Sequence, residues 1–281
     1  MQCRDVDEAP APPNAPPGEA PDEAALPEIA PGAPLPEVLR VWGLAFLAVL
    51  VARSLGAFVP VLAPYGGLFV GAAFLLLALR MAARERAGLA RFGIALGGLL
   101  GPAQDDGRPA GPLGLFELAR TLWRARAAAL REASVALGLA ALIFPPYVLA
   151  FHALEIPVRP AGAFDLGAMV SAALGQLVVI ALPEEVFFRG YVQTRLGDAF
   201  GPPRSALGRL LGVAPKTLAL QALLFGAVHL ASPAPNPARL ATFFPGLLFG
   251  VLRARRGDVG AAILFHALCN VLAELLYRGW V

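Results

Sequence analysis

The stretch from Leu182 to Tyr191 reads LPEEVFFRGY and places two adjacent glutamates and an arginine at the end of a long apolar run. A charge at membrane depth is costly, so ionisable groups there usually face the interior of a helix bundle and mark a functional site. Three ionisable residues between Glu184 and Arg189 therefore predict a buried site, and the rest of the chain is expected to provide the bundle that encloses it.

The composition is that of a membrane protein. Of the 281 residues, 57% are hydrophobic and 15% are charged, and the mean hydropathy is +0.65. A soluble domain carries about a quarter charged residues. The long apolar stretches predict an all-α, polytopic membrane bundle with about seven transmembrane helices, within a range of six to eight. The net charge of +3 comes from arginines beside the apolar runs, which indicates membrane topology and no nucleic-acid partner.

Three regions are expected along the chain. Residues 1–36 hold ten prolines, many alanines and several acids, and such a segment buries too little apolar surface to fold. We predict a disordered tail there. Residues 37–165 are expected to contain transmembrane helices 1 to 3 and an arginine-rich cytoplasmic segment, and residues 166–281 to form the membrane core that carries the chemistry.

Apolar runs near the length needed to cross a bilayer give the expected spans. They cover residues 38–59, 66–80, 133–154, 165–195, 216–230, 239–252 and 259–277, of which the sixth is the shortest run. Leu115 to Arg131 alternates apolar and basic residues at helical spacing and predicts a separate amphipathic helix on the membrane surface. The arginine bias places the N-terminus in the cytoplasm and the C-terminus outside.

The two adjacent glutamates are expected to have different roles. Residues four apart are neighbours on an α-helix, so Glu185 and Arg189 can form an ion pair. Glu184 then points about 100° away and is free to act as a general base. Pro183 removes a backbone donor, which can distort the helix locally and admit water.

Polar residues on two other apolar helices complete a candidate catalytic set. His229 lies near the end of the fifth span, and His266 and Asn270 share a face of the seventh. Imidazole transfers protons at neutral pH, and amide or imidazole donors stabilise an oxyanion. Together with Glu184 these residues suit hydrolysis by an activated water molecule, and we expect all four to line one cavity.

Other interpretations of these residues stay open. Glu185 and Arg189 could form a structural salt bridge, and the histidines and Asn270 could serve as interhelical hydrogen bonds in a scaffold or transporter. Glu184, His229 and His266 would also suit a catalytic zinc ion, although the sequence has no HExxH motif. Neither Cys3 nor Cys269 has the spacing of a metal site.

The expected depths of two residues disagree. At 1.5 Å per residue, upright helices would put Glu184 near the cytoplasmic face and His229 nearer the outer face. Tilt, a kink at Pro183 or a different entry point for either helix would reconcile the two depths.

The sequence resembles the CPBP or Abi family of intramembrane proteases, which includes the CAAX prenyl proteases. Its motifs stand here in order as EEVFFR, FGAVH and HALCN, within residues 166–273. The resemblance implies a glutamate-dependent endopeptidase without a required metal. In it Glu184 would activate a water molecule that His229 helps to position, His266 and Asn270 would stabilise the oxyanion, and Glu185 and Arg189 would brace the site.

The same resemblance bears on substrate and location. It implies a membrane protein or a lipid-modified protein as substrate, cleaved within or beside the bilayer. The single lysine among many arginines and the abundant Ala, Gly and Pro indicate a GC-rich genome. We therefore expect an integral protein of a bacterial cytoplasmic membrane.

Overall fold

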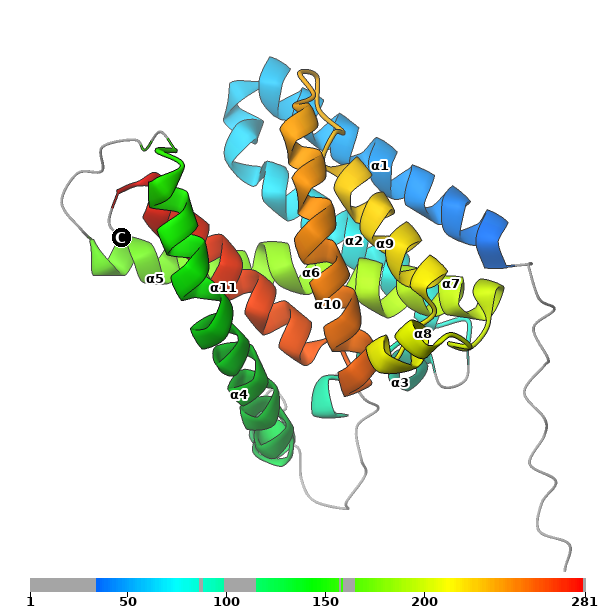
Figure 1. Cartoon of the computed structure of the whole chain (residues 1–281). Coiled ribbons are helices and arrows are strands. Elements are labelled where there is room, and N and C mark those ends of the chain that lie inside the picture. Colours follow the sequence, from blue (N-terminus) through cyan, green and yellow to red (C-terminus); the bar gives the residue numbers. More distant parts are fainter. Residues whose placement is uncertain (1–33, 86–87, 99–114, 157, 159–164, 280–281) are drawn as a thin grey trace, which may run out of the picture. The chain divides into compact units, whose positions relative to one another are not determined.

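The computed structural model describes residues 34–85, 88–98, 115–156, 158 and 165–279 of the chain. Within these ranges the chain forms helices and no strand, which confirms the all-α prediction (Figure 1). Most of the expected N-terminal tail lies outside the described residues. Its last residues, from Pro34 onward, belong to the first helix, so the boundary expected after residue 36 falls inside that helix.

Among the described residues, five helical segments are long and apolar enough to cross a membrane. They are α1 (Pro34–Phe58), η1 with α2 (Pro60–Tyr65 and Gly66–Ala82), α4 (Leu115–Ala153), the segment Leu166–Phe200, and α11 (Gly260–Tyr277). Short helices connect them or follow them: α3 (Gly88–Arg91), η2 (Leu96–Gly98), α8 (Ala206–Leu211) and η6 (Pro237–Thr242).

Two of the seven expected spans are helices too short to cross a bilayer unaided. α9 (Pro215–Val228) and α10 (Phe243–Arg256) have 14 residues each, about 21 Å at 1.5 Å per residue. A hydrocarbon core is about 30 Å thick. All seven segments are therefore helical as expected, but only five of them have the length of a span.

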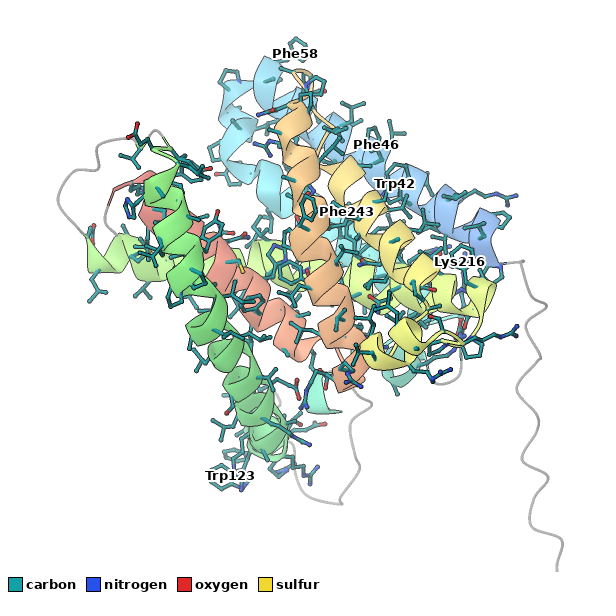
Figure 2. The ribbon with its side chains drawn as sticks, in the orientation of Figure 1. Trp42, Phe46, Phe58, Trp123, Lys216 and Phe243 are labelled. Atoms are coloured by element: carbon teal, nitrogen blue, oxygen red, sulfur yellow. The ribbon has the colours of Figure 1, made fainter. Side chains whose placement is uncertain are left out.

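The helix α4 differs from the prediction. The expected surface helix and third span are one continuous helix of 39 residues, which runs through Pro145 and Pro146. Its length is about 58 Å, roughly twice the thickness of a hydrocarbon core. Figure 2 shows Trp123 at the end of α4 that projects from the other helices. The prediction of two separate elements was wrong, because the helical backbone continues through the point at which the charge pattern changes.

The segment Leu166–Phe200 is continuous but irregular. It consists of α5 (Leu166–Gly175), the π-helix η4 (Gln176–Ala181), α6 (Leu182–Glu185), the π-helix η5 (Val186–Val192) and α7 (Gln193–Phe200). Asp165 caps its start by accepting hydrogen bonds from two backbone N–H groups. Short π-helical stretches are rare and are frequent at functional sites. Here they lie on either side of Pro183, which has no N–H group to donate.

The glutamate-bearing segment crosses the other helices instead of standing parallel to them. In Figure 1 it runs behind α10, and it packs against α2, α9, α10 and α11. Phe74 of α2 stacks on Phe187 with ring centroids 5.1 Å apart and meets Phe188 edge-on at 5.6 Å. The expected conflict of depths assumed upright, parallel helices, and this crossing segment does not meet that assumption.

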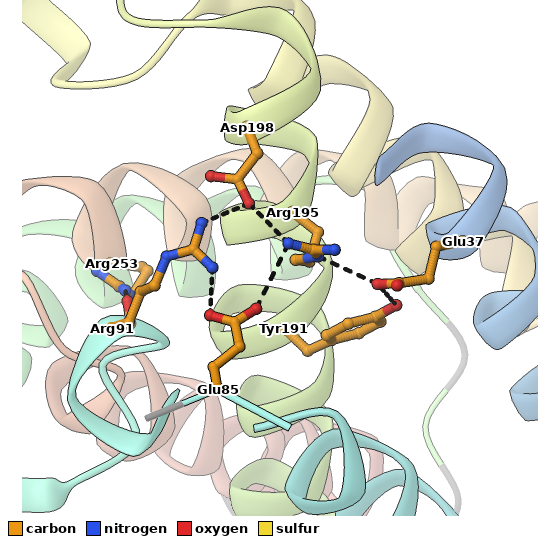
Figure 3. Close-up of polar contacts among 7 residues, drawn as sticks. All are labelled: Glu37, Glu85, Arg91, Tyr191, Arg195, Asp198 and Arg253. Carbon is orange, nitrogen blue, oxygen red and sulfur yellow. Dashed lines mark hydrogen bonds and ion pairs between the residues drawn. The ribbon is translucent and has the colours of Figure 1, made fainter. Parts of the chain in front are cut away.

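A charged cluster holds the far end of this segment (Figure 3). Arg195 donates to Glu37 at 3.1 Å and to Asp198 at 3.2 Å, and Tyr191 also donates to Glu37 at 3.2 Å. Arg91 bonds Asp198 at 2.6 Å and also pairs with Glu85. These contacts join α1, α7 and the chain after α2.

The guanidinium of Arg91 remains charged within that cluster. Partial burial acts to lower its pKa, but the hydrogen bonds with Glu85 and Asp198 outweigh burial and raise the pKa above its usual value. Arg91 is thus a permanent cation between two carboxylates.

Replacing Gly71 with alanine is expected to lower thermal stability. A Cβ atom at this position of α2 would lie 2.6 Å from the carbonyl oxygen of Val179 and 3.2 Å from Pro183 Cγ. The helix would have to move away from η4, and overpacking of this kind costs roughly 1–3 kcal/mol. The measurement is the midpoint of thermal unfolding of the purified proteins in one detergent.

Gly43→Ala is the matched control, because no atom lies within 4 Å of a Cβ built on Gly43 in α1. Alanine favours a helix over glycine, so this variant should be neutral or slightly stabilised. A Gly71→Ala midpoint at or above that of the control would contradict the close packing of α2 on η4.

Candidate active site

The centre of the site is a buried carboxylate shared by two basic side chains. Glu185 Oε1 accepts from Arg189 Nη1 at 2.9 Å and lies 2.8 Å from His266 Nδ1. The side chains of Glu185 and Arg189 are both 0% exposed. The expected pair one helical turn apart is therefore present, and His266 joins it from α11.

Aromatic rings surround the guanidinium of Arg189. Its Cζ lies 4.1 Å from the ring centroid of Phe225 on α9 and 5.0 Å from that of Phe249 on α10. Its Nη2 donates to the carbonyl of Gly246 at 3.3 Å. A guanidinium is weakly hydrated and stacks on aromatic faces, so it is the cation best suited to such a place.

His266 lies between the two adjacent glutamates. A carboxylate only accepts hydrogen bonds, so its contact with Glu185 assigns a proton to Nδ1. Nε2 then points to Glu184, whose Oε2 is 3.8 Å away. The ring stacks on Phe249 with centroids 4.8 Å apart and planes 19° apart, which fixes its orientation.

Glu184 has a different environment from its neighbour. Its side chain is 12% exposed, and its buried Oε2 has no hydrogen-bond partner among the residues that the structure describes. The 3.8 Å separation from His266 is too long for a direct hydrogen bond. One carboxylate is thus fixed by two donors and the other is left available to a third molecule.

His229 follows directly after α9 and approaches the same place. Its Nδ1 is 2.8 Å from the carbonyl oxygen of Phe225, so Nδ1 carries the proton and Nε2 is the acceptor in the neutral ring. The Phe225 ring meets His229 at 4.9 Å and His266 at 6.0 Å. Glu184 lies within electrostatic range of His229.

Asn270 lies one turn beyond His266 on α11 but has a partner of its own. Its Nδ2 donates to Gln176 Oε1 of η4 at 2.9 Å. The structure records no hydrogen bond from Asn270 to the other predicted site residues in the described ranges. Sequence reasoning missed Gln176, although a single amide within the apolar run from Leu166 to Leu182 was a visible signal.

Two more buried amides were also missed, and both hold α10. Gln221 donates to the carbonyl of Gly246 at 2.8 Å, and Gln193 to that of Gly250 at 2.9 Å. A Cβ at Gly250 would lie 2.7 Å from Gln221 Nε2, so glycine permits this close approach. These contacts place the carbonyl of Gly246 where Arg189 uses it.

The alternative zinc set of Glu184, His229 and His266 is not found as a ready-made ligand group among the described residues. In the described part of the chain, no three His, Cys, Asp or Glu side chains are arranged to hold a metal ion together. Nδ1 of each histidine in the site is occupied by a protein acceptor, Glu185 for His266 and a backbone carbonyl for His229.

The site lies within a segment that matches a known family. The model of the family described as "Type II CAAX prenyl endopeptidase Rce1-like" matches residues 166–272. We call this matched segment the Rce1-like domain, for its similarity to that family. The domain includes every predicted site residue from Glu184 to Asn270, and the match bears out the resemblance to CAAX proteases and indicates intramembrane protease activity. No curated protein and no solved structure matches the chain.

Replacing Arg189 with glutamine is expected to destabilise the Rce1-like domain strongly. The change leaves the buried Glu185 carboxylate without its guanidinium, and removal of one partner of a buried pair costs roughly 3–5 kcal/mol. Unfolding by a denaturing detergent, followed by circular dichroism, measures the loss.

Arg278→Gln is the matched control, since Arg278 pairs with Glu274 at the same spacing on an exposed surface, with side chains 51% and 39% exposed. An exposed pair contributes about 0–1 kcal/mol. Equal effects of the two substitutions would contradict the central role of the buried pair.

Proposed function

We propose that the Rce1-like domain hydrolyses a peptide bond of a membrane-associated or lipid-modified protein, with a water molecule activated by Glu184. The observation that carries this proposal is the placement of Glu184 Oε2, a buried oxygen without a protein partner, 3.8 Å from an oriented imidazole. A single water molecule can bond both atoms at that separation.

The proposed reaction follows general-base catalysis. Glu184 takes a proton from water as the oxygen attacks the carbonyl carbon of the scissile bond, and it returns the proton to the departing amine. His229 orients the water through Nε2, because its Nδ1 is engaged by Phe225. The C–N bond then breaks to leave a carboxylate and an amine.

The negative charge that develops on the carbonyl oxygen needs donors. His266 donates from Nε2 when its ring is protonated, and the adjacent Glu185 carboxylate stabilises the positive charge on that ring. Asn270 donates one amide N–H to Gln176, and its second amide N–H is available to the oxyanion. Glu185 and Arg189 position these groups without touching the substrate.

The proposed setting is a bacterial cytoplasmic membrane with the N-terminus in the cytoplasm, and the proposed reaction requires no metal. The five long apolar helices and the family match support a membrane-embedded enzyme. A substrate anchored in the same bilayer would reach the site by lateral diffusion.

Glu184→Gln is expected to abolish cleavage while the protein folds normally. Loss of a general base lowers the rate by roughly 10²–10⁴-fold. The assay uses purified protein in detergent and internally quenched peptides with an S-farnesyl cysteine three residues from the C-terminus, beside unprenylated counterparts, with products identified by mass spectrometry. Glu274→Gln, outside the proposed catalytic set, should retain full activity.

The same preparation distinguishes a glutamate mechanism from a zinc mechanism. We expect activity to persist after chelation that removes all metal by elemental analysis. Activity that is lost with the metal and restored by zinc would sink the glutamate mechanism, as would full activity of Glu184→Gln.

Gln176→Leu is expected to lower kcat with little change in KM. The substitution removes the acceptor that orients Asn270, and this donor acts mainly on the transition state, so a loss of about tenfold is expected. Ser171→Ala, on α5 of the same segment, is the control. A Gln176→Leu enzyme with unchanged kcat would show that Asn270 does not need this partner.

A further inference from the structure

An arginine outside the predicted catalytic set contacts the backbone of the site. Arg53, near the end of α1, donates through Nη1 to the carbonyl oxygens of His229 at 3.2 Å and Ala231 at 3.3 Å. Carbonyls at a helix C-terminus carry partial negative charge and are stabilised by a cation. This contact fixes the guanidinium beside His229.

Most donors of this guanidinium remain unused. An arginine has five N–H groups, and among the described residues only Nη1 of Arg53 makes hydrogen bonds. Glu184 does not take the others, since its Oε2 has no hydrogen-bond partner in these ranges and no ion pair joins the two side chains. The edge formed by Nε and Nη2 has the geometry that binds a carboxylate through two parallel bonds.

A second arginine acts on the same place. Arg239, an exposed residue of η6, and Glu184 are the charged groups whose fields act on Arg53. The backbone of η6 is fixed there: Asn236 caps it at 3.0 Å, and Thr242 donates to the carbonyl of Arg239 at 2.8 Å. η6 packs against α9, whose end Arg53 caps, so Arg239 adds a second positive charge near Arg53, whose own charge Glu184 offsets.

We propose that Arg53 and Arg239 form a carboxylate-binding subsite next to the scissile bond. The inference rests on the proposed protease function and makes it more specific: the preferred substrate carries a carboxylate close to the cleavage position. That carboxylate is either the free C-terminus of a short leaving peptide or an acidic side chain. If Arg53 served only to cap α9, the protein would show no preference for an anion.

Binding to an inactive enzyme tests the subsite separately from the chemistry. The probes are three fluorescent S-farnesyl peptides with the same core: one with a free C-terminal carboxylate, one with a C-terminal amide, and one amide with glutamate as the last residue. Affinities for full-length Glu184→Gln protein are measured by fluorescence anisotropy in detergent. We expect the acid to bind about tenfold or more tightly than the plain amide.

Variants in the Glu184→Gln background assign the preference to the arginines. Arg53→Gln should reduce the acid-to-amide ratio to near one, and Arg239→Gln should reduce it in part. Arg40→Gln, an exposed position on the same helix, should leave it unchanged. If Arg53→Gln fails to fold, Arg239→Gln still tests the subsite. Arg239 lies on the surface, and its replacement must lower the acid-to-amide affinity ratio if the subsite exists.

Each outcome is separable from the fate of the proposed function. Equal affinity for all three peptides, or a preference for a carboxylate-bearing peptide that the arginine variants leave unchanged, overturns the subsite even where wild-type protein cleaves. A strong, Arg53-dependent preference without any cleavage by wild type supports the subsite and overturns the protease. Tight binding of the glutamate-ended amide identifies a side chain as the source of the carboxylate, and weak binding identifies the C-terminus.

Discussion

The buried carboxylate of Glu185 is the interaction on which the rest of the site depends. It accepts from Arg189 and His266 with no exposure to solvent, so neither basic group can move away without leaving an uncompensated charge in an apolar interior. The desolvation of these groups is costly, and the cost is offset only because each has further partners: aromatic faces and a carbonyl for Arg189, and the ring of Phe249 for His266. The pair consequently constrains three helices besides its own, because Phe225, Phe249 and His266 come from α9, α10 and α11. Each helix that supplies one of these contacts is therefore held at a fixed distance from the pair and in a fixed rotation about its own axis.

This constraint gives a role to α9 and α10, two of the expected spans that are only 14 residues long. α9 and α10 are too short to cross a bilayer by themselves, yet they provide two of the rings around Arg189 and the carbonyl of Gly246. Their packing depends on small residues and buried amides: a Cβ at Gly246 would lie 3.1 Å from the Phe225 ring, and Gln193 and Gln221 bond carbonyls on the glycine face of α10. Backbones that approach so closely exclude bulky side chains and lipid from the neighbourhood of the charges. The function of these helices in the fold is to enclose the site.

The sequence predicted the parts of this arrangement that depend on local spacing. Seven helices, the Glu185 and Arg189 pair, and the three polar motifs follow from periodicity and from the cost of charge in an apolar run. The contact of His266 with Glu185 was beyond such reasoning, because it joins residues 81 positions apart and depends on how two helices cross. The same is true of Gln176 and Arg53, which look unremarkable until Asn270 and the end of α9 are placed beside them. The prediction that Leu115 to Arg131 forms a helix separate from the third span was wrong for another reason. Hydropathy indicates the surroundings of a helix, whereas its continuity depends on backbone hydrogen bonds, which polar side chains do not interrupt.

Two adjacent residues of the same type therefore have different properties, because different side chains surround them. Successive side chains on a helix point about 100° apart, so Glu184 and Glu185 face different helices although they share a backbone. Glu185 accepts from the Arg189 guanidinium and the His266 imidazole of α11, whereas Oε2 of Glu184 lies 3.8 Å from the other nitrogen of His266 and accepts no hydrogen bond from the described residues. Keeping the two carboxylates in these different places requires the helix to be fixed on both sides. The charged cluster around Arg195 and Asp198 secures one end, and the Asp165 cap and the contact of Gln176 with Asn270 secure the other. The π-helical stretches lie between these anchors, so the irregular backbone is confined to the turns that present Glu184.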